Sequence, residues 1–360
     1  MKKLIIKGMG KRYFSDKIVK WYLENQRPLP WRETTDPYRI WLSEVILQQT
    51  RVIQGLPYYH RFLQSYPTIN SLAKAPEQQV LRLWQGLGYY TRARNLHKCA
   101  KTVVDRHKGK FPSTSKELEA LPGIGSYTAA AIASFAFNEH VAVVDGNVFR
   151  MLSRIFGIDA PINSAEGRKV FAELANQLLS KKQPALHNQA VMEFGAICCT
   201  PQSPKCPECP FKNTCVAFNH DLIQVLPVKI PKKTSKKRYF FYIVVNRNKS
   251  LLMKKRDAKD IWHGLFDFVL IEKDKPVNPE YLINEQQHQK WFHKVKGIKV
   301  SKKYKHILTH QTIHCRFIQL QVEPSFPVAE EGLSFYSLSE IAKLPKPALI
   351  SRFLDEQNTN

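Results

Sequence analysis

The stretch Leu121-Pro122-Gly123-Ile124-Gly125 decides the fold, because it places two glycines one residue apart between two helical patterns. Glycine adopts positive φ and allows another group to approach its backbone closely. A tight turn that opens a helix presents bare backbone N–H groups, which can bind a phosphate. Ser126 follows the turn and is expected to cap the second helix. Twenty residues after Gly125, an apolar run ends in Val144-Asp145-Gly146-Asn147-Val148. We therefore predict a phosphate-binding turn and, downstream of it, a functional acid.

Each of these two features also has a plainer interpretation. The glycine stretch fits an ordinary helix–helix turn, and Asp145 fits a turn residue that caps a helix beginning near Val148. Capping and catalysis are compatible, because a helix N-terminus also holds a carboxylate in its ionised form. Taken alone, these residues leave both interpretations open.

The composition indicates a basic protein of several domains. A chain of 360 residues predicts two or three domains, and a hydrophobic content of 43% argues against global disorder. Lys and Arg number 55 against 30 Asp and Glu, so the net charge is +25 and nucleic acid is the leading candidate partner. No apolar run reaches the roughly 18 residues of a membrane helix, and the N-terminus lacks the apolar segment of a signal peptide. We expect no membrane association.

An acidic residue lies within an apolar stripe of the helix predicted to continue to Gln49. Asp36-Pro37 marks its start, as a cap followed by proline at the first helical position. At about 100° per residue, Glu44 projects between apolar neighbours. These neighbours are Ile40, Trp41 and Leu47. Burial raises the pKa of such a carboxyl, which suits a general acid near neutral pH. The alternative is a structural ion pair with Arg32 or Arg51.

Four of the seven cysteines lie within seventeen residues, with the spacing Cys-x6-Cys-x2-Cys-x5-Cys. They are Cys199, Cys206, Cys209 and Cys215. Such a group indicates a metal site in a reducing compartment rather than a set of disulfides. Four thiolates suit tetrahedral zinc or a [4Fe–4S] cluster, and the chemistry alone does not choose between them. Cys198 competes with Cys199 as the first ligand.

The periodicity of the sequence changes along the chain. Helical patterns cover 15–110, 116–137 and 165–197, and they are followed by a basic stretch at 227–238 that carries six positive charges. This stretch is a linker by composition or a segment that follows a DNA backbone. Strand patterns cover 239–245, 251–255 and 266–271, and Ile313, Cys315 and Phe317 alternate with polar residues. Helices are expected around 279–291 and 338–344. We predict a separate α+β domain.

Taken together, these features resemble the MutY-type adenine DNA glycosylases, within the wider endonuclease III-like group. The motifs that carry the resemblance are Pro30-Trp31-Arg32, the stretch from Trp41 to Thr50, Gly86-Leu87-Gly88-Tyr89-Tyr90, the glycine turn, the Asp145 segment and the four cysteines. The resemblance implies an all-α catalytic region over 1–226, with a helix-hairpin-helix at about 116–137 and an iron–sulfur loop at 199–215. It also implies a linker over 227–238 and a C-terminal α+β Nudix-like domain over 239–360 that reads the lesion.

The resemblance implies a chemistry for the site. Glu44 would protonate adenine N7, and Asp145 would stabilise the oxocarbenium-like sugar, with Asn147 orienting Asp145 and Tyr127 supporting the sugar. Bifunctional relatives have a lysine at the position of Tyr127, so a monofunctional hydrolase is expected. The cofactor implied is a [4Fe–4S] cluster on Cys199, Cys206, Cys209 and Cys215.

The resemblance also assigns binding residues. Those expected to contact DNA are Gly123, Gly125, Gln49, Thr50 and Tyr89. Those expected to line the adenine pocket are Trp31, Arg32, Leu47 and Gln189. The lesion-reading loop, commonly Phe-Ser-His in the family, corresponds to Leu308, Thr309 and His310. Leucine replaces the aromatic residue and loses stacking worth about 1–3 kcal/mol per base, so weaker lesion affinity is expected. The acidic helix of Nudix hydrolases is missing from the sequence, so nucleotide hydrolysis is not expected.

The expected partner is double-stranded DNA with adenine opposite 8-oxoguanine or G. We expect a monomeric, cytoplasmic and prokaryotic protein associated with the nucleoid, with other repair proteins as further candidate partners. Two alternatives stay open: a glycosylase for oxidised pyrimidines or for T·G mismatches, and a non-catalytic iron–sulfur protein that binds DNA. Tyr127 and the C-terminal domain argue against the first. The intact pair of Glu44 and Asp145 argues against the second.

Overall fold

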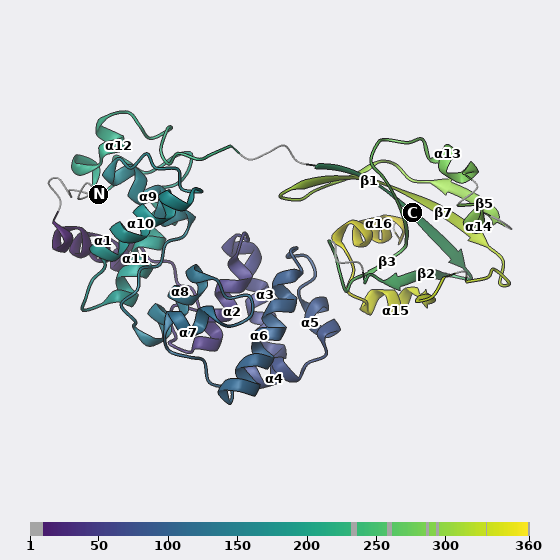
Figure 1. Ribbon diagram of the computed structural model, residues 1–360, viewed down its shortest axis with the longest axis horizontal. Helices are drawn as coiled ribbons and strands as arrows, with labels where there is room; N and C mark the ends of the chain where they lie inside the picture. Colours follow the sequence, from purple (N-terminus) through teal and green to yellow (C-terminus); the bar gives the residue numbers. More distant parts are fainter. Residues whose placement is uncertain are drawn as a thin grey trace. The chain divides into compact units, whose positions relative to one another are not determined.

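The computed structural model describes residues 10–231, 236–257, 261–285, 288–292, 295–328 and 330–358, and the chain forms two compact units (Figure 1). The first unit comprises Met1–Lys74 and Asn95–Pro231, and the second comprises Ala75–Arg94 and Lys232–Asn360. Within the described ranges, no helix combines the length and apolar character that would carry it across a membrane.

The described part of the first unit is helical, which confirms the all-α prediction for this part of the chain. Its helices are α1 (Lys11–Asn25), α2 (Pro37–Leu47), α3 (Val52–Ser65), α4 (Ile69–Lys74), most of α6 (Thr91–His107), α7 (Ser115–Glu119), α8 (Ser126–Phe137), α9 (Gly146–Phe156), α10 (Ala165–Leu178), α11 (Pro184–Ile197), the short 3-10 helix η1 (Lys212–Thr214) and α12 (Val216–Asn219). The single helical stretch predicted over 165–197 was wrong in one respect. It is two helices, because the chain leaves helical geometry at Leu179, which is extended.

The start of α2 follows the prediction, and the start of α8 does not. The Asp36 carboxylate accepts a hydrogen bond of 2.9 Å from the backbone N–H of Tyr38, with Pro37 in the first helical position. At α8, the cap is Gly125, and Ser126 is already helical and makes no capping bond. The predicted Ser126 cap was therefore wrong by one residue. A glycine cap leaves the helix N-terminus without a side chain in front of its N–H groups.

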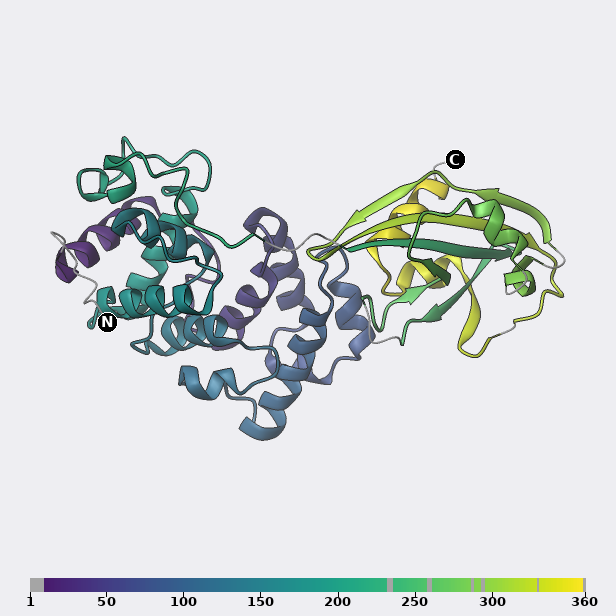
Figure 2. The ribbon, with the colours of Figure 1, turned by 45° about the horizontal axis from the view of Figure 1, so that its top comes forward.

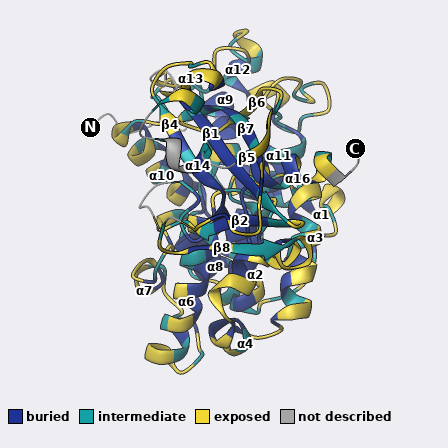
Figure 3. Cartoon of the chain, turned by 90° about the vertical axis from the view of Figure 1, so that its right-hand side faces the viewer, coloured by how far each residue is buried: buried dark blue, intermediate teal, exposed yellow. Residues whose placement is uncertain are grey.

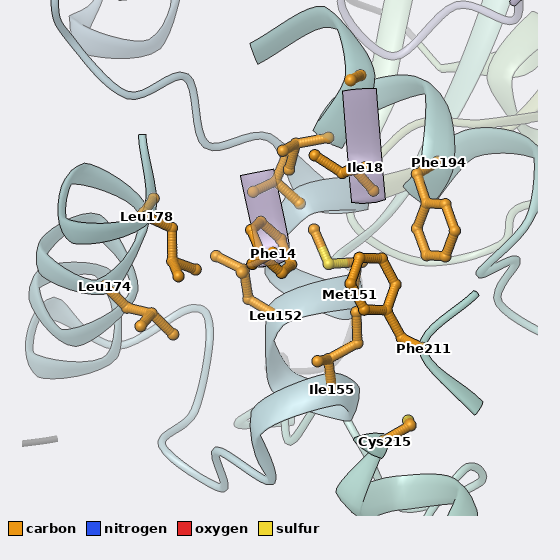
Figure 4. Packing of buried hydrophobic residues seen from close by; sticks show 14 of the residues in the cluster. Phe14, Ile18, Met151, Leu152, Ile155, Leu174, Leu178, Phe194, Phe211 and Cys215 are labelled. Atoms are coloured by element: carbon orange, nitrogen blue, oxygen red, sulfur yellow. The ribbon is translucent and has the colours of Figure 1, made fainter. Parts of the chain in front are cut away.

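A core of aromatic and aliphatic side chains holds α1, α9, α10 and α11 together (Figure 4). Phe14 and Ile18 of α1 point at Met151 and Leu152 of α9, and all four side chains are fully or almost fully buried. Burying each such side chain is worth roughly 1.5–3 kcal/mol. The Lys17 ammonium adds a 2.8 Å hydrogen bond to the carbonyl of Pro210. The N-terminal helix is thereby fixed to segments that lie far along the chain.

Gly195 of α11 lies against the N-terminus of α9. A Cβ added at Gly195 would lie 2.6 Å from the carbonyl oxygen of Asn147, which is closer than real Cβ atoms come. Only glycine allows the two helices to approach this closely. The contact fixes the position of Asp145, the residue that caps α9.

The described part of the second unit contains a mixed eight-stranded sheet, in which β1 and β7 pair in parallel over most of their length (Figure 2). Its strands are β1 (Lys236–Arg247), β2 (Ser250–Lys255), β3 (Phe266–Asp267), β4 (Val269–Lys273), β5 (Val295–Val300), β6 (Tyr304–Ile307), β7 (Gln311–Val322) and β8 (Leu333–Ser337). Its helices are α5 (Glu77–Leu83), α13 (Pro279–Asn284), α14 (Gln289–Phe292), α15 (Leu338–Lys343) and α16 (Ala348–Asn358). The order along the sheet is β3-β2-β1-β7-β5, with β4, β6 and β8 paired to β1, β7 and β2. The predicted α+β class is confirmed.

Three boundaries in this unit differ from the prediction. The linker predicted over 227–238 ends earlier, because β1 begins at Lys236, and its residues 232–235 lie outside the described ranges. The strand predicted over 266–271 is interrupted at Phe268, which separates β3 from β4. The helix predicted around 279–291 is two short helices, α13 and α14.

Each face of the sheet is covered by helices. On one face, Ile243 and Ile318 belong to an apolar cluster with Leu282 of α13 and Trp291 of α14. On the other face, the rings of Phe317 and Phe353 of α16 stack at 3.9 Å. The alternation predicted around Ile313, Cys315 and Phe317 is confirmed, since all three are buried and separated by less buried residues. Figure 3 shows the buried stretches of β1 and β7 in dark blue.

Candidate active site

A cavity of about 560 Å³ lies within the first unit. Its wall is formed by the segment before α2, by α2 and the residues after it, and by parts of α8, α9 and α11. The structure brings to it all the residues predicted for catalysis and for the adenine pocket, with two of those predicted to contact DNA. These residues are Trp31, Arg32, Glu44, Leu47, Gln49, Thr50, Tyr127, Asp145, Asn147 and Gln189. The cavity has the size of a small-molecule site.

Glu44 is a buried acid on the cavity wall, with only 9% of its surface exposed. The Tyr127 hydroxyl donates a 2.8 Å hydrogen bond to its Oε2. Burial raises the pKa of Glu44 to about 7; the nearby Asp145 adds to this, while the Tyr127 hydrogen bond and Arg32 act against it. Arg32 forms its ion pair with Glu193, at 2.6 Å. Glu44 therefore holds its proton close to neutral pH.

Asp145 caps α9 from the cavity wall. Its Oδ1 accepts hydrogen bonds from the backbone N–H groups of Asn147 (2.9 Å) and Val148 (2.8 Å), and its Oδ2 accepts one of 2.7 Å from the Asn147 amide. Burial raises the pKa of Asp145, whereas these donors and Arg150 favour the ionised form. The capping interpretation of Asp145 is confirmed, and the same bonds aim the carboxylate.

The raised pKa of Glu44 predicts a cost to folding at alkaline pH. The folded protein keeps a proton that the unfolded chain, with a pKa near 4.5, releases, so stability falls as the pH rises from 4.5 through 7. Glu44→Gln removes this loss, because glutamine does not titrate. Relative to the parent, we therefore expect the free energy of unfolding of this variant to rise by about 3 kcal/mol between pH 4 and pH 8. Urea unfolding at both pH values measures it. An advantage that does not change with pH would contradict the prediction.

A second layer of charge, which the sequence analysis missed, supports the cavity wall. Glu193 of α11 is fully buried and binds both Arg27 and Arg32. Beside it, the Tyr22 hydroxyl donates to Gln189 Oε1 at 2.9 Å. The sequence could have predicted the place of Glu193, because Gln189 and Glu193 are four residues apart and share one helix face. A pocket residue at 189 therefore places the carboxylate at 193 next to the same pocket.

The glycine turn lies outside the cavity. Gly123 is exposed and has φ of 76°, and a Cβ there would lie 2.5 Å from Cβ of Asn95, so both its conformation and its neighbour require glycine. Gly125 is exposed and open on its Cβ side. Bare backbone thus faces solvent at the start of α8.

The four predicted metal-ligating cysteines lie on the loop that follows α11, all as free thiols. Arg154 approaches Cys199 Sγ at 3.7 Å, and the backbone N–H of Phe211 approaches Cys209 Sγ at 3.4 Å. In the described part of the chain, no three His, Cys, Asp or Glu side chains are grouped closely enough to hold a metal ion as they stand. Arg150 joins this loop to the cavity, because it donates to the Cys199 carbonyl (2.7 Å) and to the Asn147 amide oxygen (2.9 Å).

The remaining predicted residues belong to the second unit. Tyr89 is exposed, has φ of 49°, and its hydroxyl contacts that of Thr309. The predicted lesion loop is the turn between β6 and β7, where the Leu308 N–H donates to the Gln311 carbonyl at 2.8 Å. Leu308 is half-buried, whereas Thr309 and His310 are exposed. The His310 side chain is thus exposed at this turn, beside the Thr309 hydroxyl that contacts Tyr89.

Both parts of the chain are similar to known protein families. Residues 42–177 match the HhH-GPD superfamily of base excision DNA repair proteins, and residues 240–356 match the NUDIX domain. An adenine DNA glycosylase from Buchnera aphidicola subsp. Baizongia pistaciae is 35% identical over 84% of this chain and 84% of that protein. The adenine DNA glycosylase of Buchnera aphidicola subsp. Schizaphis graminum is 30% identical over 95% of this chain and 98% of its own length.

Solved structures agree on the fold of the helical part. A thermostable thymine-DNA glycosylase superposes with a TM-score of 0.54 and 30% identity, over 58% of this chain and 96% of that one. An endonuclease III–DNA complex superposes with a TM-score of 0.51 and 23% identity, over 59% of this chain and 99% of that one, which shows a shared fold. Because its relatives match over most of their own length, the chain belongs to the adenine DNA glycosylase family, with a helix-hairpin-helix glycosylase region followed by a NUDIX domain.

Proposed function

We propose that the protein hydrolyses the N-glycosidic bond of adenine opposite 8-oxoguanine or G in duplex DNA. The observation that carries the proposal is the pair of acids on one cavity: Glu44, buried and protonated near neutral pH, and Asp145, aimed by three hydrogen bonds. One group suits proton donation and the other suits stabilisation of a cation. Depurination by hydrolysis needs both.

The leaving group is the first requirement. Adenine must leave the base stack, because the duplex hides its glycosidic bond. Glu44 donates its proton to N7, so that adenine departs as a neutral base. The Tyr127 hydroxyl, bonded to Glu44 Oε2, leaves Oε1 of the carboxyl for the base.

The sugar is the second requirement. Loss of the base leaves an oxocarbenium-like sugar, which a carboxylate stabilises, as in glycoside hydrolysis generally. Asp145 supplies that charge, Asn147 holds its Oδ2, and Tyr127 lines the same cavity. Water then adds at C1′, with Glu44 accepting its proton and returning to the protonated state.

The residues proposed to bind DNA differ from those proposed to carry out the reaction. Exposed backbone at Gly123 and Gly125 suits contact with phosphate, which positions the duplex without reading sequence. Gln49 is exposed at the rim of the cavity with φ of 56°, and together with Thr50 and Tyr89 it is proposed to contact the distorted duplex. The proposed readers of the lesion are Leu308, Thr309 and His310.

The cofactor that we propose is a [4Fe–4S] cluster on Cys199, Cys206, Cys209 and Cys215. The donor set fits it, because four thiols lie on one loop and Arg150 and Arg154 bring positive charge beside Cys199. When bound, the cluster supplies a cross-link that fixes the loop. Arg150 then links the fixed loop to the cavity wall, because it donates hydrogen bonds to both Cys199 and Asn147.

The test is a glycosylase assay on duplex DNA with one adenine opposite 8-oxoguanine, followed by hot alkali. Release of adenine, with strand breaks only after alkali, supports the substrate and the hydrolytic chemistry. Release of thymine from a T·G duplex in its place would favour the alternative substrate class. Tight binding without any release would make the protein a non-catalytic DNA-binding protein.

The lack of an amine nucleophile gives a further expected result. Tyr127 stands where bifunctional relatives have lysine, and among the residues that the structure describes no lysine lines the cavity. A phenol cannot form an imine with C1′, so borohydride should trap no covalent protein–DNA adduct during excision. Denaturing gels of borohydride-treated reactions measure this, with a bifunctional glycosylase as the positive control. Trapping at the level of that control would overturn the monofunctional assignment.

A further inference from the structure

The fully buried carboxylate of Glu193 is used by no step of the proposed reaction. It accepts four hydrogen bonds: three from Arg27, through the backbone N–H (3.1 Å), Nε (2.7 Å) and Nη2 (2.6 Å), and one from Arg32 Nη2 (2.6 Å). Both oxygens are therefore occupied, and none is left to accept a proton from a substrate. The side chain lies on the cavity wall that also carries Glu44.

Glu193 and its two arginine partners together carry a net positive charge. One carboxylate faces two guanidiniums, so the wall keeps a single net positive charge beside an acid that has to stay protonated. Arg32 is the member that acts on Glu44, where it favours the ionised form. Loss of the carboxylate would leave both positive charges uncompensated. Arg32 is the more buried of the two, with 14% of its side chain exposed, and charges in such a site interact more strongly than in water.

We propose that Glu193 is a positioning residue that fixes Arg32 on the cavity wall and neutralises it, so that Arg32 does not drive Glu44 to ionise. Glu193 joins three segments for this purpose: α11, the residues after α1 and the turn before α2. Arg32 in turn lies over the ring of Tyr22, at 5.6 Å, and the Tyr22 hydroxyl holds Gln189. The inference rests on the proposed role of Glu44 as the general acid.

Other ionisable groups line the cavity wall together with Glu44. These groups are Arg27, Arg32, Arg51, Tyr127, Asp145 and Glu193. Asp145 favours the protonated form of Glu44, while Tyr127 and Arg32 favour the ionised form. Removing the carboxylate at 193 and removing the guanidinium at 27 change the local charge in opposite directions. Their effects on the pH profile must therefore have opposite signs.

The experiment measures single-turnover excision of adenine by the full-length protein over a pH series on both sides of 7. In the parent, we expect the rate to fall as the pH rises through the pKa of Glu44, about 7. Glu193→Gln should move this fall to lower pH by about one unit, a roughly tenfold loss of rate on the alkaline side. Arg27→Gln should move it to higher pH. Glu272→Gln is the matched control, because Glu272 also binds an arginine (Arg238) through two bonds of 2.6 and 2.7 Å but does not line the cavity.

Opposite shifts in the first two variants and none in the control support the inference. Unmoved profiles, with only the plateau rate or the melting temperature changed, would show a purely structural role and overturn it. If Glu193→Gln does not fold, Arg27→Gln decides alone, because the Arg27 side chain is 37% exposed and its exchange leaves Glu193 paired with Arg32. Normal excision by Glu44→Gln would instead overturn the proposed acid itself, so the two failures are distinguishable.

Discussion

Glu44→Gln is expected to lower the single-turnover rate of adenine excision by about a thousandfold, in the middle of the range that a general acid contributes. Glutamine keeps the volume of the side chain and an oxygen that accepts the 2.8 Å hydrogen bond from Tyr127. It cannot supply the proton that makes adenine a neutral leaving group. The exchange therefore removes the chemistry and preserves the shape of the cavity.

Binding provides the control for this variant. Affinity for the A·8-oxoguanine duplex, measured by fluorescence anisotropy, should stay within a few-fold of the parent, because the exposed glycine turn is unchanged. Quenched-flow or manual single-turnover assays give the excision rate. A rate within tenfold of the parent would show that the proton comes from another group.

Asp145→Asn is expected to lower excision by at least about a hundredfold, the scale of losing one preorganised electrostatic contact in a buried site. The amide carries no charge to balance the oxocarbenium-like sugar. Its oxygen can still accept the bonds from the N–H groups of Asn147 and Val148, and asparagine caps helices as well as aspartate does. Stability should therefore change by only about 1 kcal/mol, mainly because the new NH₂ group faces the Asn147 amide.

A matched exchange separates capping from catalysis. Asp36→Asn makes the same change at the cap of α2, where the carboxylate accepts from Tyr38 and does not line the cavity. We expect this variant to excise adenine at the parental rate, and thermal melting of both variants checks their folding. Equal losses of activity in the two variants would reduce Asp145 to a structural cap.

Local pattern predicted much of the helical unit. The Asp36-Pro37 signal gave the start of α2, and the apolar stripe around Glu44 gave its burial. The family motifs collected residues that share one cavity, although they come from segments as far apart as Trp31 and Gln189. The motifs around Trp31, Glu44 and Asp145 meet at this cavity because residues of each short run form part of its wall.

The features that the sequence did not predict depend on contacts between residues far apart in the chain. The bond between Arg27 and Glu193 joins residues that no local period connects, and a buried charge pair has no hydrophobic signature. The edge strand β5 was missed because its sequence, Val-Lys-Gly-Ile-Lys-Val, is mostly exposed and becomes a strand only through its pairing with β7. The Ser126 cap was wrong because the turn ends one residue earlier than its side-chain chemistry suggests.

The packing of α1 has a consequence for synthesis of the chain. Phe14 and Ile18 bury themselves against α9, and Lys17 reaches the carbonyl of Pro210. During translation at roughly 5–20 residues per second, the apolar face of this first helix waits for many seconds until its partners leave the ribosome. Helix α1 thus reaches its final packing only after segments far along the chain have been made, and its apolar face lacks these partners over that interval.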